Sequence, residues 1–150
     1  MGESVKSYQD LDVWNIGIDL VLRIYAVVGR LPPSERFELS AQMRRAVVSV
    51  PSNIAEGHAR RRPKPYLNHV EIALGSLAEL VTCLVVARRL GFLTQAEFDE
   101  ETRGTDRVGQ MLHGLSRSLA RRVGDERLGI ALGTFSGWLV LGAMFSGLFR

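Results

Sequence analysis

The chain has 150 residues, 46% of them hydrophobic and 7% aromatic, with a formal net charge of +3 and a pI of about 9.5. This length suits one domain with an aliphatic core, and the composition argues against disorder. A single cysteine, Cys83, excludes an intramolecular disulfide and a multi-cysteine zinc site, and fits a reducing compartment. The segment MGESVKSYQD at 1–10 lacks the apolar core of a signal peptide, so we expect a cytoplasmic body.

Apolar residues recur at alternating steps of three and four in the first 57 residues, which is the period of an amphipathic helix. The first predicted stripe comprises Leu11, Trp14, Ile18, Val21, Tyr25 and Val28. Pro32 and Pro33 then interrupt the chain. The second predicted stripe, in a helix that continues to Gly57, comprises Leu39, Met43, Ala46, Val47, Val50 and Ile54.

Two more helices are expected after the charged turn HARRRPKP at 58–65. The third stripe follows a heptad pattern up to a stop at Gly91 and comprises Leu67, Val70, Leu74, Leu77, Val81 and Leu84. Thr94 and Glu97 form a capping-box signature for the fourth helix, whose stripe comprises Phe98, Thr105, Val108, Leu112, Leu115 and Leu119. No segment alternates with a period of two. We therefore predict an all-α protein: an antiparallel up-down-up-down four-helix bundle over 1–124, with an apolar C-terminal tail helix within 125–150.

The segment SVPSNIAEG at 49–57 carries a proline inside the second helix, where proline costs roughly 3 kcal/mol. We expect a kink there, with a Ser or Asn side chain bound to the freed carbonyl, and a small polar surface that admits a neighbouring helix. Small residues of the third helix would match it. The residues predicted for this kink and interface are Ser49, Pro51, Ser52, Asn53, Glu56, Gly57 and Gly75. The alternative is a ligand pocket with Asn53 and Glu56 as its polar groups.

The antiparallel topology predicts one basic end, because the turn between the second and third helices meets the start of the first and the end of the fourth. Lys6 and His58 belong to this end. The residues predicted to bind nucleic acid are Arg60, Arg61, Arg62, Lys64, Tyr66, Arg117, Arg121 and Arg122. The cations beside a helix N-terminus suit phosphates, and Tyr66 suits stacking on a base. For a monomer a solvated turn is the alternative, whereas a closed ring would join these patches into a basic collar.

Catalytic and metal motifs find little support in the sequence. None of the three histidines stands three residues after a glutamate, so the Glu-x-x-His pairs of di-iron bundles are absent. The segments GIALG and GTFSG lack the lysine and strand of a phosphate-binding loop. Glu97 and the acidic residues at 99–101 are expected to form a solvated first turn. We expect no enzymatic activity, no metal and no cofactor.

Three segments, in this order along the chain, resemble one known family. They are YQDLDVW at 8–14, QMRRAVVSVPSNIAEG at 42–57 and IALGSLAEL at 72–80. Over about residues 8–120 the chain resembles the four-helix bundle proteins encoded in intervening sequences of bacterial 23S ribosomal RNA genes, to which the accessory proteins of diversity-generating retroelements are related. The resemblance implies a non-enzymatic homopentamer around a central channel. For the retroelement branch it also implies nucleic acid and a reverse transcriptase as partners.

The segment LGIALGTFSGWLVLGAMFSGLF at 128–149 has no charge and is long enough, as a helix, to cross a bilayer core of about 30 Å. Gly129, Gly133 and Gly137 have the spacing that lets membrane helices touch. The segment is interpreted as a membrane anchor, an oligomer interface or a poorly ordered extension. As an anchor it would hold the chain at the cytoplasmic membrane, with the basic end towards anionic lipid.

Together these observations favour a non-enzymatic, oligomeric bundle that binds the backbone of RNA or DNA through its basic end, with little sequence specificity. The alternative is a membrane-anchored or soluble protein-interaction scaffold, such as an accessory subunit of a nucleic-acid enzyme.

Overall fold

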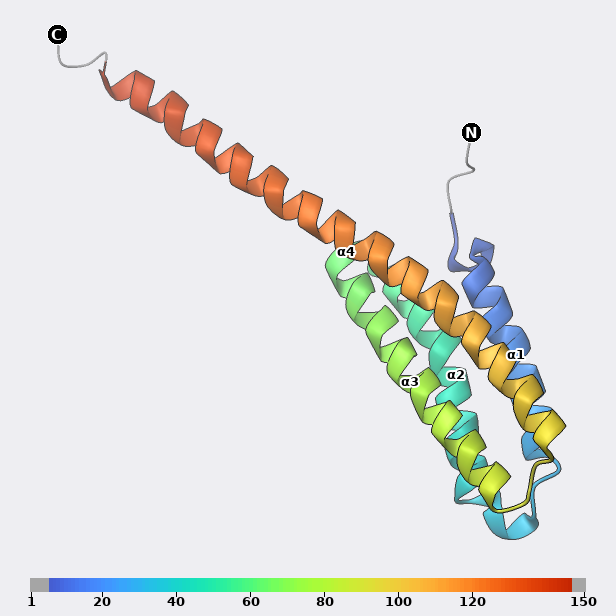
Figure 1. The fold of residues 1–150 in the computed structure, drawn as a ribbon. Helices are drawn as coiled ribbons and strands as arrows, with labels where there is room; N and C mark the ends of the chain where they lie inside the picture. The colour runs from blue at the N-terminus through green and yellow to red at the C-terminus, as the bar shows by residue number, and fades with distance from the viewer. Residues whose placement is uncertain (1–5, 147–150) are drawn as a thin grey trace.

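The computed structural model describes residues 6–146, with side chains described for residues 6–126 and 128. Four α-helices make up the fold: α1 (Asp12–Val28), α2 (Leu39–Ala59), α3 (Pro63–Arg89) and α4 (Gln95–Ser146). Two short 3-10 helices, η1 (Tyr8–Asp10) and η2 (Pro33–Arg36), precede α1 and α2, and residues 6–146 contain no strand. Consecutive helices run antiparallel, and α4 returns to pack beside α1 (Figure 1). The predicted four-helix bundle is confirmed.

The helix boundaries follow local sequence signals. Gly91 ends α3 with a left-handed φ of 78°, and the Phe92 N–H donates to the Ala87 carbonyl over 2.9 Å, as in a Schellman motif. Thr94 caps α4: its hydroxyl accepts from the Glu97 N–H, and the Glu97 carboxylate accepts from the Thr94 N–H over 2.8 Å. Both predicted boundaries are confirmed. They set the length of the α3–α4 connection and hence the antiparallel return of α4.

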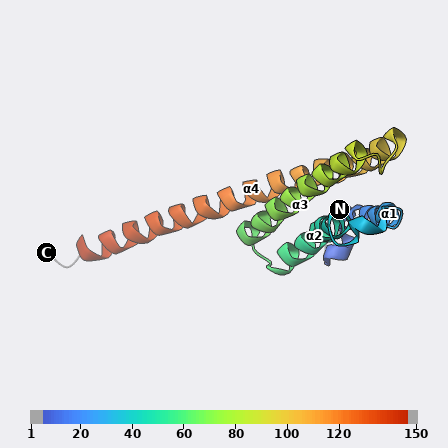
Figure 2. The ribbon, with the colours of Figure 1, turned by 90° about the horizontal axis from the view of Figure 1, so that it is seen from below.

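Viewed from below, α1 and α2 form one layer and α3 and α4 the other (Figure 2). The most extensive contacts between helices join α2 to α3, and the sparsest of the four helix pairs in contact is α1 with α4. The buried residues of α2 and α4 include most of the predicted stripes, with Leu39, Phe98 and Leu115 only half-buried. The core therefore runs the length of the bundle and is densest along α2 and α3.

On α1 the predicted stripe is wrong by about one residue. The buried residues are Val13, Gly17, Leu20, Ile24, Val27 and Val28, whereas the predicted Tyr25 is 47% exposed. Apolar residues occur on most sides of α1, so the spacing of apolar residues alone does not identify its buried face. On α3 half of the predicted stripe is only partly buried, and the core also includes Ala73, Leu80 and Ala87.

Pro51 is buried inside α2, which continues as one helix from Leu39 to Ala59. Its ring lies against Gly17 of α1, where an added Cβ would be 3.7 Å from the Cβ of Pro51. The sequence predicted that a Ser or Asn side chain would bind the carbonyl freed by Pro51, and this prediction is wrong. A proline at 51 frees the Val47 carbonyl, but the Ser52 hydroxyl donates to the Val48 carbonyl and the Asn53 amide to that of Ser49.

A buried ion pair joins α1 to α4 and was not foreseen from the sequence. The Arg23 guanidinium lies 3.2 Å from the Glu101 carboxylate, whose side chain is only 8% exposed. Arg23 lies directly over Gly104, where a Cβ would collide with the guanidinium. Burial raises the pKa of Glu101, and the charge of Arg23 opposes that rise. A second pair, Arg30 with Glu97 at 3.1 Å, links the same two helices near solvent.

Beyond the other three helices α4 continues as an isolated helix (Figure 1). It passes without a break through residues 124 and 125, where the sequence suggested a change from bundle to tail. The side chains at 129–146 and the whole of 147–150 lie outside the described residues, so the predicted roles of 128–149 rest on sequence. Among the described residues, only α3 has the length and hydropathy of a membrane span, and α3 supplies core residues to the bundle.

Candidate nucleic-acid interface

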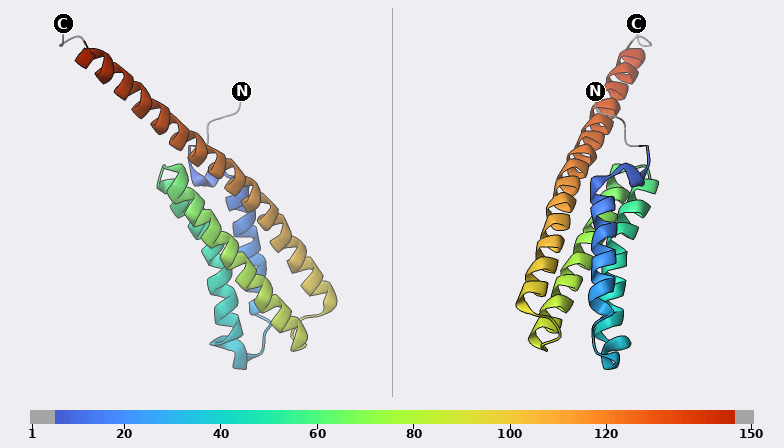
Figure 3. Two further views of the ribbon diagram at one scale, coloured as in Figure 1. Left: turned by 60° about the vertical axis from the view of Figure 1, so that its left-hand side comes forward. Right: turned by 90° about the vertical axis from the view of Figure 1, so that its right-hand side faces the viewer.

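Three segments distant in sequence meet at one end of the bundle: the residues before η1, the turn between α2 and α3, and α4 near residue 122 (Figure 3). They surround a cavity of about 600 Å³. Its basic lining consists of Lys6, Arg61, Arg62 and Arg122. The remaining lining consists of His58, Pro63, Tyr66 and Leu119, with Asp125 and Glu126 as the acidic members. The basic end expected from topology therefore borders a cavity that is open to solvent.

The turn between α2 and α3 is short and its backbone is constrained on both sides. Arg60 caps α2, and Arg61 follows with a φ of 56°, in the left-handed region that usually takes glycine. Arg62 is extended, and Pro63 opens α3 at a position where its missing N–H is not needed. A non-glycine residue in this conformation costs roughly 1–2 kcal/mol. The turn therefore keeps arginine at a position where glycine would be more stable.

The predicted binding residues divide into those that line the cavity and those that do not. Arg61, Arg62, Tyr66 and Arg122 line it. The exposed Lys64, Arg117 and Arg121 belong to the same part of the fold but not to the lining.

Arg60 points elsewhere, because it donates to the Glu56 carboxylate over 2.6 Å. This hydrogen bond, followed by the charge of His69, holds the pKa of Glu56 below its ordinary value. Among the described residues, the four basic side chains of the lining have no carboxylate within 4 Å. Sequence reasoning treated the three arginines of the turn alike, although the four-residue spacing of Glu56 and Arg60 favours their pairing.

Tyr66 is not the open stacking platform that the sequence suggested. One side of its ring covers Gly57, where a Cβ would lie 3.0 Å from the Tyr66 Cε2, and its edge meets the His58 ring at a centroid distance of 6.0 Å. Burial raises the pKa of Tyr66 to about 12. The buried hydroxyl has no hydrogen-bond partner among the described residues. Tyr66 thus forms a wall of the cavity, and Gly57 leaves room for it.

The N-terminus of α3 offers few backbone donors to an anion. Pro63 and Pro65 lack an N–H, and the Tyr66 N–H donates to the Arg62 carbonyl over 3.1 Å. Of the first three residues of α3, Lys64 alone has an N–H. The expected contribution of the helix N-terminus to phosphate binding is therefore small, and the arginine side chains must supply most of the attraction.

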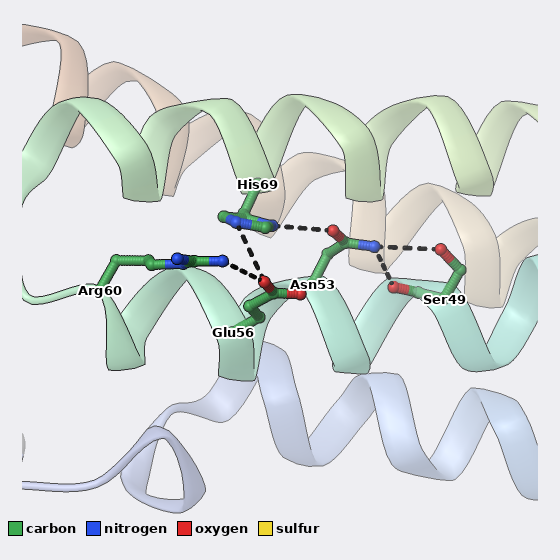
Figure 4. Close-up of polar contacts among 5 residues, drawn as sticks. All are labelled: Ser49, Asn53, Glu56, Arg60 and His69. Carbon is green, nitrogen blue, oxygen red and sulfur yellow. Dashed lines mark hydrogen bonds and ion pairs between the residues drawn. The ribbon is translucent and has the colours of Figure 1, made fainter.

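A chain of polar contacts joins α2 to α3 next to this turn (Figure 4). The Asn53 amide donates to the Ser49 carbonyl over 2.9 Å, which turns its oxygen towards His69. The His69 Nδ1 then donates to this oxygen over 3.0 Å, and its Nε2 lies 3.7 Å from the Glu56 carboxylate. The hydroxyls of Ser49 and Ser76 lie 2.8 Å apart. The segment 49–57 thus fixes one helix against the other, and neither Asn53 nor Glu56 lines the cavity.

Two members of the predicted kink and interface set lie outside this contact. Gly75 is exposed, and an added Cβ there would have no neighbour within 4 Å. Ser52 is exposed and binds only within its own helix. Gly75 is therefore on the outward side of α3, whereas Ala73 is buried in the core. His69 was missed, because a histidine partner for Asn53 cannot be read from separations within one helix.

Among residues 6–126 and 128, no three His, Cys, Asp or Glu side chains are grouped so that they could hold a metal ion. Glu101, the buried carboxylate among the described residues, lies on the part of α4 that is far from the basic end. It pairs with Arg23 of α1 and does not line the cavity at the basic end.

Residues 9–114 match the model of the family described as 23S rRNA-intervening sequence protein. A solved structure from Bacteroides thetaiotaomicron, described as a protein with unknown function from the S23 ribosomal protein family, has a TM-score of 0.66 and 20% identity. The alignment covers 70% of this chain and 95% of that one. At this identity the similarity shows the fold. No curated protein matches the chain. Lys6 and the α4 part of the cavity lie outside the residues matched by the family.

Proposed function

The chain belongs to the 23S rRNA-intervening sequence protein family, and from this premise we propose that it is a non-enzymatic binding protein for RNA or DNA. One observation carries the proposal: four basic side chains from three segments surround a cavity, with no carboxylate within 4 Å among the described residues. Clustered cations without internal partners raise the local positive potential and attract a polyanion. The family description makes ribosomal RNA fragments the first ligands to test.

Binding would act chiefly through phosphates. The guanidinium groups of Arg61, Arg62 and Arg122 can each donate two parallel hydrogen bonds to a phosphate, and each contact releases counterions from the strand. Lys64, Arg117 and Arg121 extend the basic surface beyond the cavity. Arg60 contributes less, because its charge is already compensated by Glu56. Contacts of this kind bind any strand of nucleic acid, with little preference for its base sequence.

Assembly into a cytoplasmic homopentamer is part of the proposal. Exposed apolar side chains on α1 and α2 support self-association: Leu22 is 65% exposed, and Tyr25 and Val48 flank a groove of about 350 Å³. A ring would repeat the basic end around its axis and sum the attraction of the copies. The resemblance to retroelement accessory proteins, noted from the sequence, makes a reverse transcriptase a candidate protein partner.

The test is fluorescence anisotropy of the full chain with labelled single-stranded RNA and DNA across a salt series. We expect affinity to fall steeply with salt, and Arg61→Gln/Arg62→Gln to reduce the slope of log K against log salt by about 1.4 for each copy that binds. Arg88→Gln/Arg89→Gln is the matched control, because it removes two adjacent arginines at the other end of α3. Equal effects of both variants, or no binding at low salt, would overturn the proposal.

The uncharged segment at 128–149 favours a second candidate, a membrane-anchored interaction scaffold. Arg121 and Arg122 would then lie near anionic lipid headgroups. Flotation of the full chain with vesicles containing anionic lipid, lost on deletion of 128–150, would support this candidate. A chain that binds RNA but does not float would exclude it.

A further inference from the structure

We propose that the cavity at the basic end takes one unpaired nucleotide of a bound strand, with its phosphate against the arginines and its base inside the cavity. This inference rests on the proposed function and names the part of the nucleic acid that the site recognises. The ligand chemistry is that of a nucleoside phosphate, which a strand or a free nucleotide could supply.

The shape of the site favours a single nucleotide over a continuous backbone. Binding of a continuous backbone needs only an exposed row of cations, whereas this end contains a cavity of about 600 Å³, within the size range of small-molecule pockets. The N-terminal segment, the α2–α3 turn and α4 each provide one side of it. A volume of this kind suits a compact group that leaves the strand, as unstacked bases do in single-stranded recognition.

The cavity is lined by both basic and acidic side chains. Arg122, Asp125 and Glu126 share one face of α4, since they are three and four residues apart, and all three line the cavity. Two carboxylates would repel a phosphate that filled the whole cavity. They instead accept hydrogen bonds from the amino groups of a base, while Arg61 and Arg62 from the opposite side hold its phosphate. A mixed lining of this kind fits a nucleotide better than a bare phosphate.

One side of the cavity is apolar. Pro63, Tyr66 and Leu119 give the cavity an apolar side against which the flat face of a base can pack. Tyr66 lines the cavity through its ring, because its hydroxyl oxygen is closed off from solvent. A base that packs against this ring buries apolar surface on both partners.

The carboxylates also predict a preference among bases. Adenine, cytosine and guanine carry exocyclic amino groups that can donate to Asp125 or Glu126. Uracil has a single ring N–H between two carbonyl oxygens, which the carboxylates repel. We therefore expect an unpaired adenosine to bind more tightly than an unpaired uridine, and Asp125→Asn/Glu126→Gln to remove this difference.

The experiment compares three RNA duplexes with the full chain: blunt, with one unpaired 3′ adenosine, and with one unpaired 3′ abasic residue. The abasic overhang carries the same added phosphate without the base. We expect the adenosine overhang to bind at least about fivefold more tightly than the abasic one, which is the gain of roughly one hydrogen bond. Fluorescence of 2-aminopurine at the overhang would report whether the base is enclosed.

Two variants separate recognition from folding. Tyr66→Leu removes the aromatic ring that lines the cavity, so it should abolish much of the preference for the adenosine overhang, whereas Tyr66→Phe keeps the ring and should keep the preference. A purely structural role of Tyr66 would leave the preference unchanged. Asp99→Asn/Glu100→Gln, at the exposed start of α4, is the control for the carboxylate variant and should leave the base preference intact.

The outcomes distinguish the two proposals. Equal, salt-sensitive binding of all three duplexes would overturn the nucleotide site and leave backbone binding in place. No binding of any duplex or single strand at low salt would overturn the proposed function itself. Free adenosine monophosphate that binds as tightly as the overhang would assign the cavity to a free nucleotide and overturn recognition within a strand.

Discussion

At the α2–α3 contact, the absence of a side chain on Gly57 determines how the neighbouring residues pack. Gly57 faces the ring of Tyr66 and the Cβ of His69, which an added Cβ would approach to 2.9 Å. Hydrophobic periodicity cannot identify such a position, because a glycine adds nothing to the apolar stripe. For the same reason Tyr66 looked exposed in the sequence. The wall of the cavity follows from the glycine that makes room for it.

Gly57→Ala should therefore destabilise the protein. The new methyl group must displace Tyr66 or His69, and overpacking of this kind costs about 1–3 kcal/mol, which exceeds the gain in helix propensity of about 1 kcal/mol. Urea denaturation would measure the free energy of unfolding. Gly75→Ala is the matched control: with no atom within 4 Å of its Cβ, it should raise stability by up to about 1 kcal/mol. Equal effects at the two glycines would contradict the described contact.

The buried faces of α2 and α4 were predicted well from the sequence, whereas those of α1 and α3 were not. Helix ends were readable because Gly91, Thr94 and Glu97 are local signals with local consequences. The inward face of α1 depends instead on Gly17, which receives the ring of Pro51 from another helix. The basic end followed from topology alone. Arg60 differs from the other arginines of the turn because it pairs with Glu56, and the four-residue spacing of the two residues was the signal for this pair in the sequence.

The seam between α1 and α4 should respond to pH through Glu101. Because burial raises its pKa, the folded chain holds this proton more tightly than the unfolded chain. The stability it contributes is complete below the ordinary pKa of glutamate and is lost as the pH rises through the raised value. The free energy of unfolding of the wild type minus that of Glu101→Gln should therefore decrease as the pH rises above the ordinary pKa of glutamate.

Urea denaturation at several pH values would measure this difference. Asp106→Asn, at an exposed position of the same helix, is the control and should show a smaller change with pH. A difference for Glu101→Gln that stays constant or rises with pH would contradict the burial argument.

For the whole molecule, assembly is the property that the fold leaves to be measured. Light scattering of the full chain should give a mass of five times 16.6 kDa if the proposed pentamer forms. Leu22→Glu places a charge on a side chain that is 65% exposed in the single chain, so it should dissociate the assembly without unfolding the bundle. A monomer in the wild type would remove the ring argument and leave each basic end to act alone.

The isolated continuation of α4 makes the helix a lever arm. Its last core side chain among the described residues is Leu119, and from there to Ser146 a straight helix spans about 40 Å. A tilt of about 10° around Leu119 would move the tip by roughly 7 Å but the backbone of Arg122 by less than about 1 Å. Of the α4 residues that line the cavity, Leu119 and Arg122 lie nearest this pivot, and Asp125 and Glu126 lie farther along the helix. Whatever the far end of α4 touches can therefore swing widely while the geometry around Arg122 hardly changes.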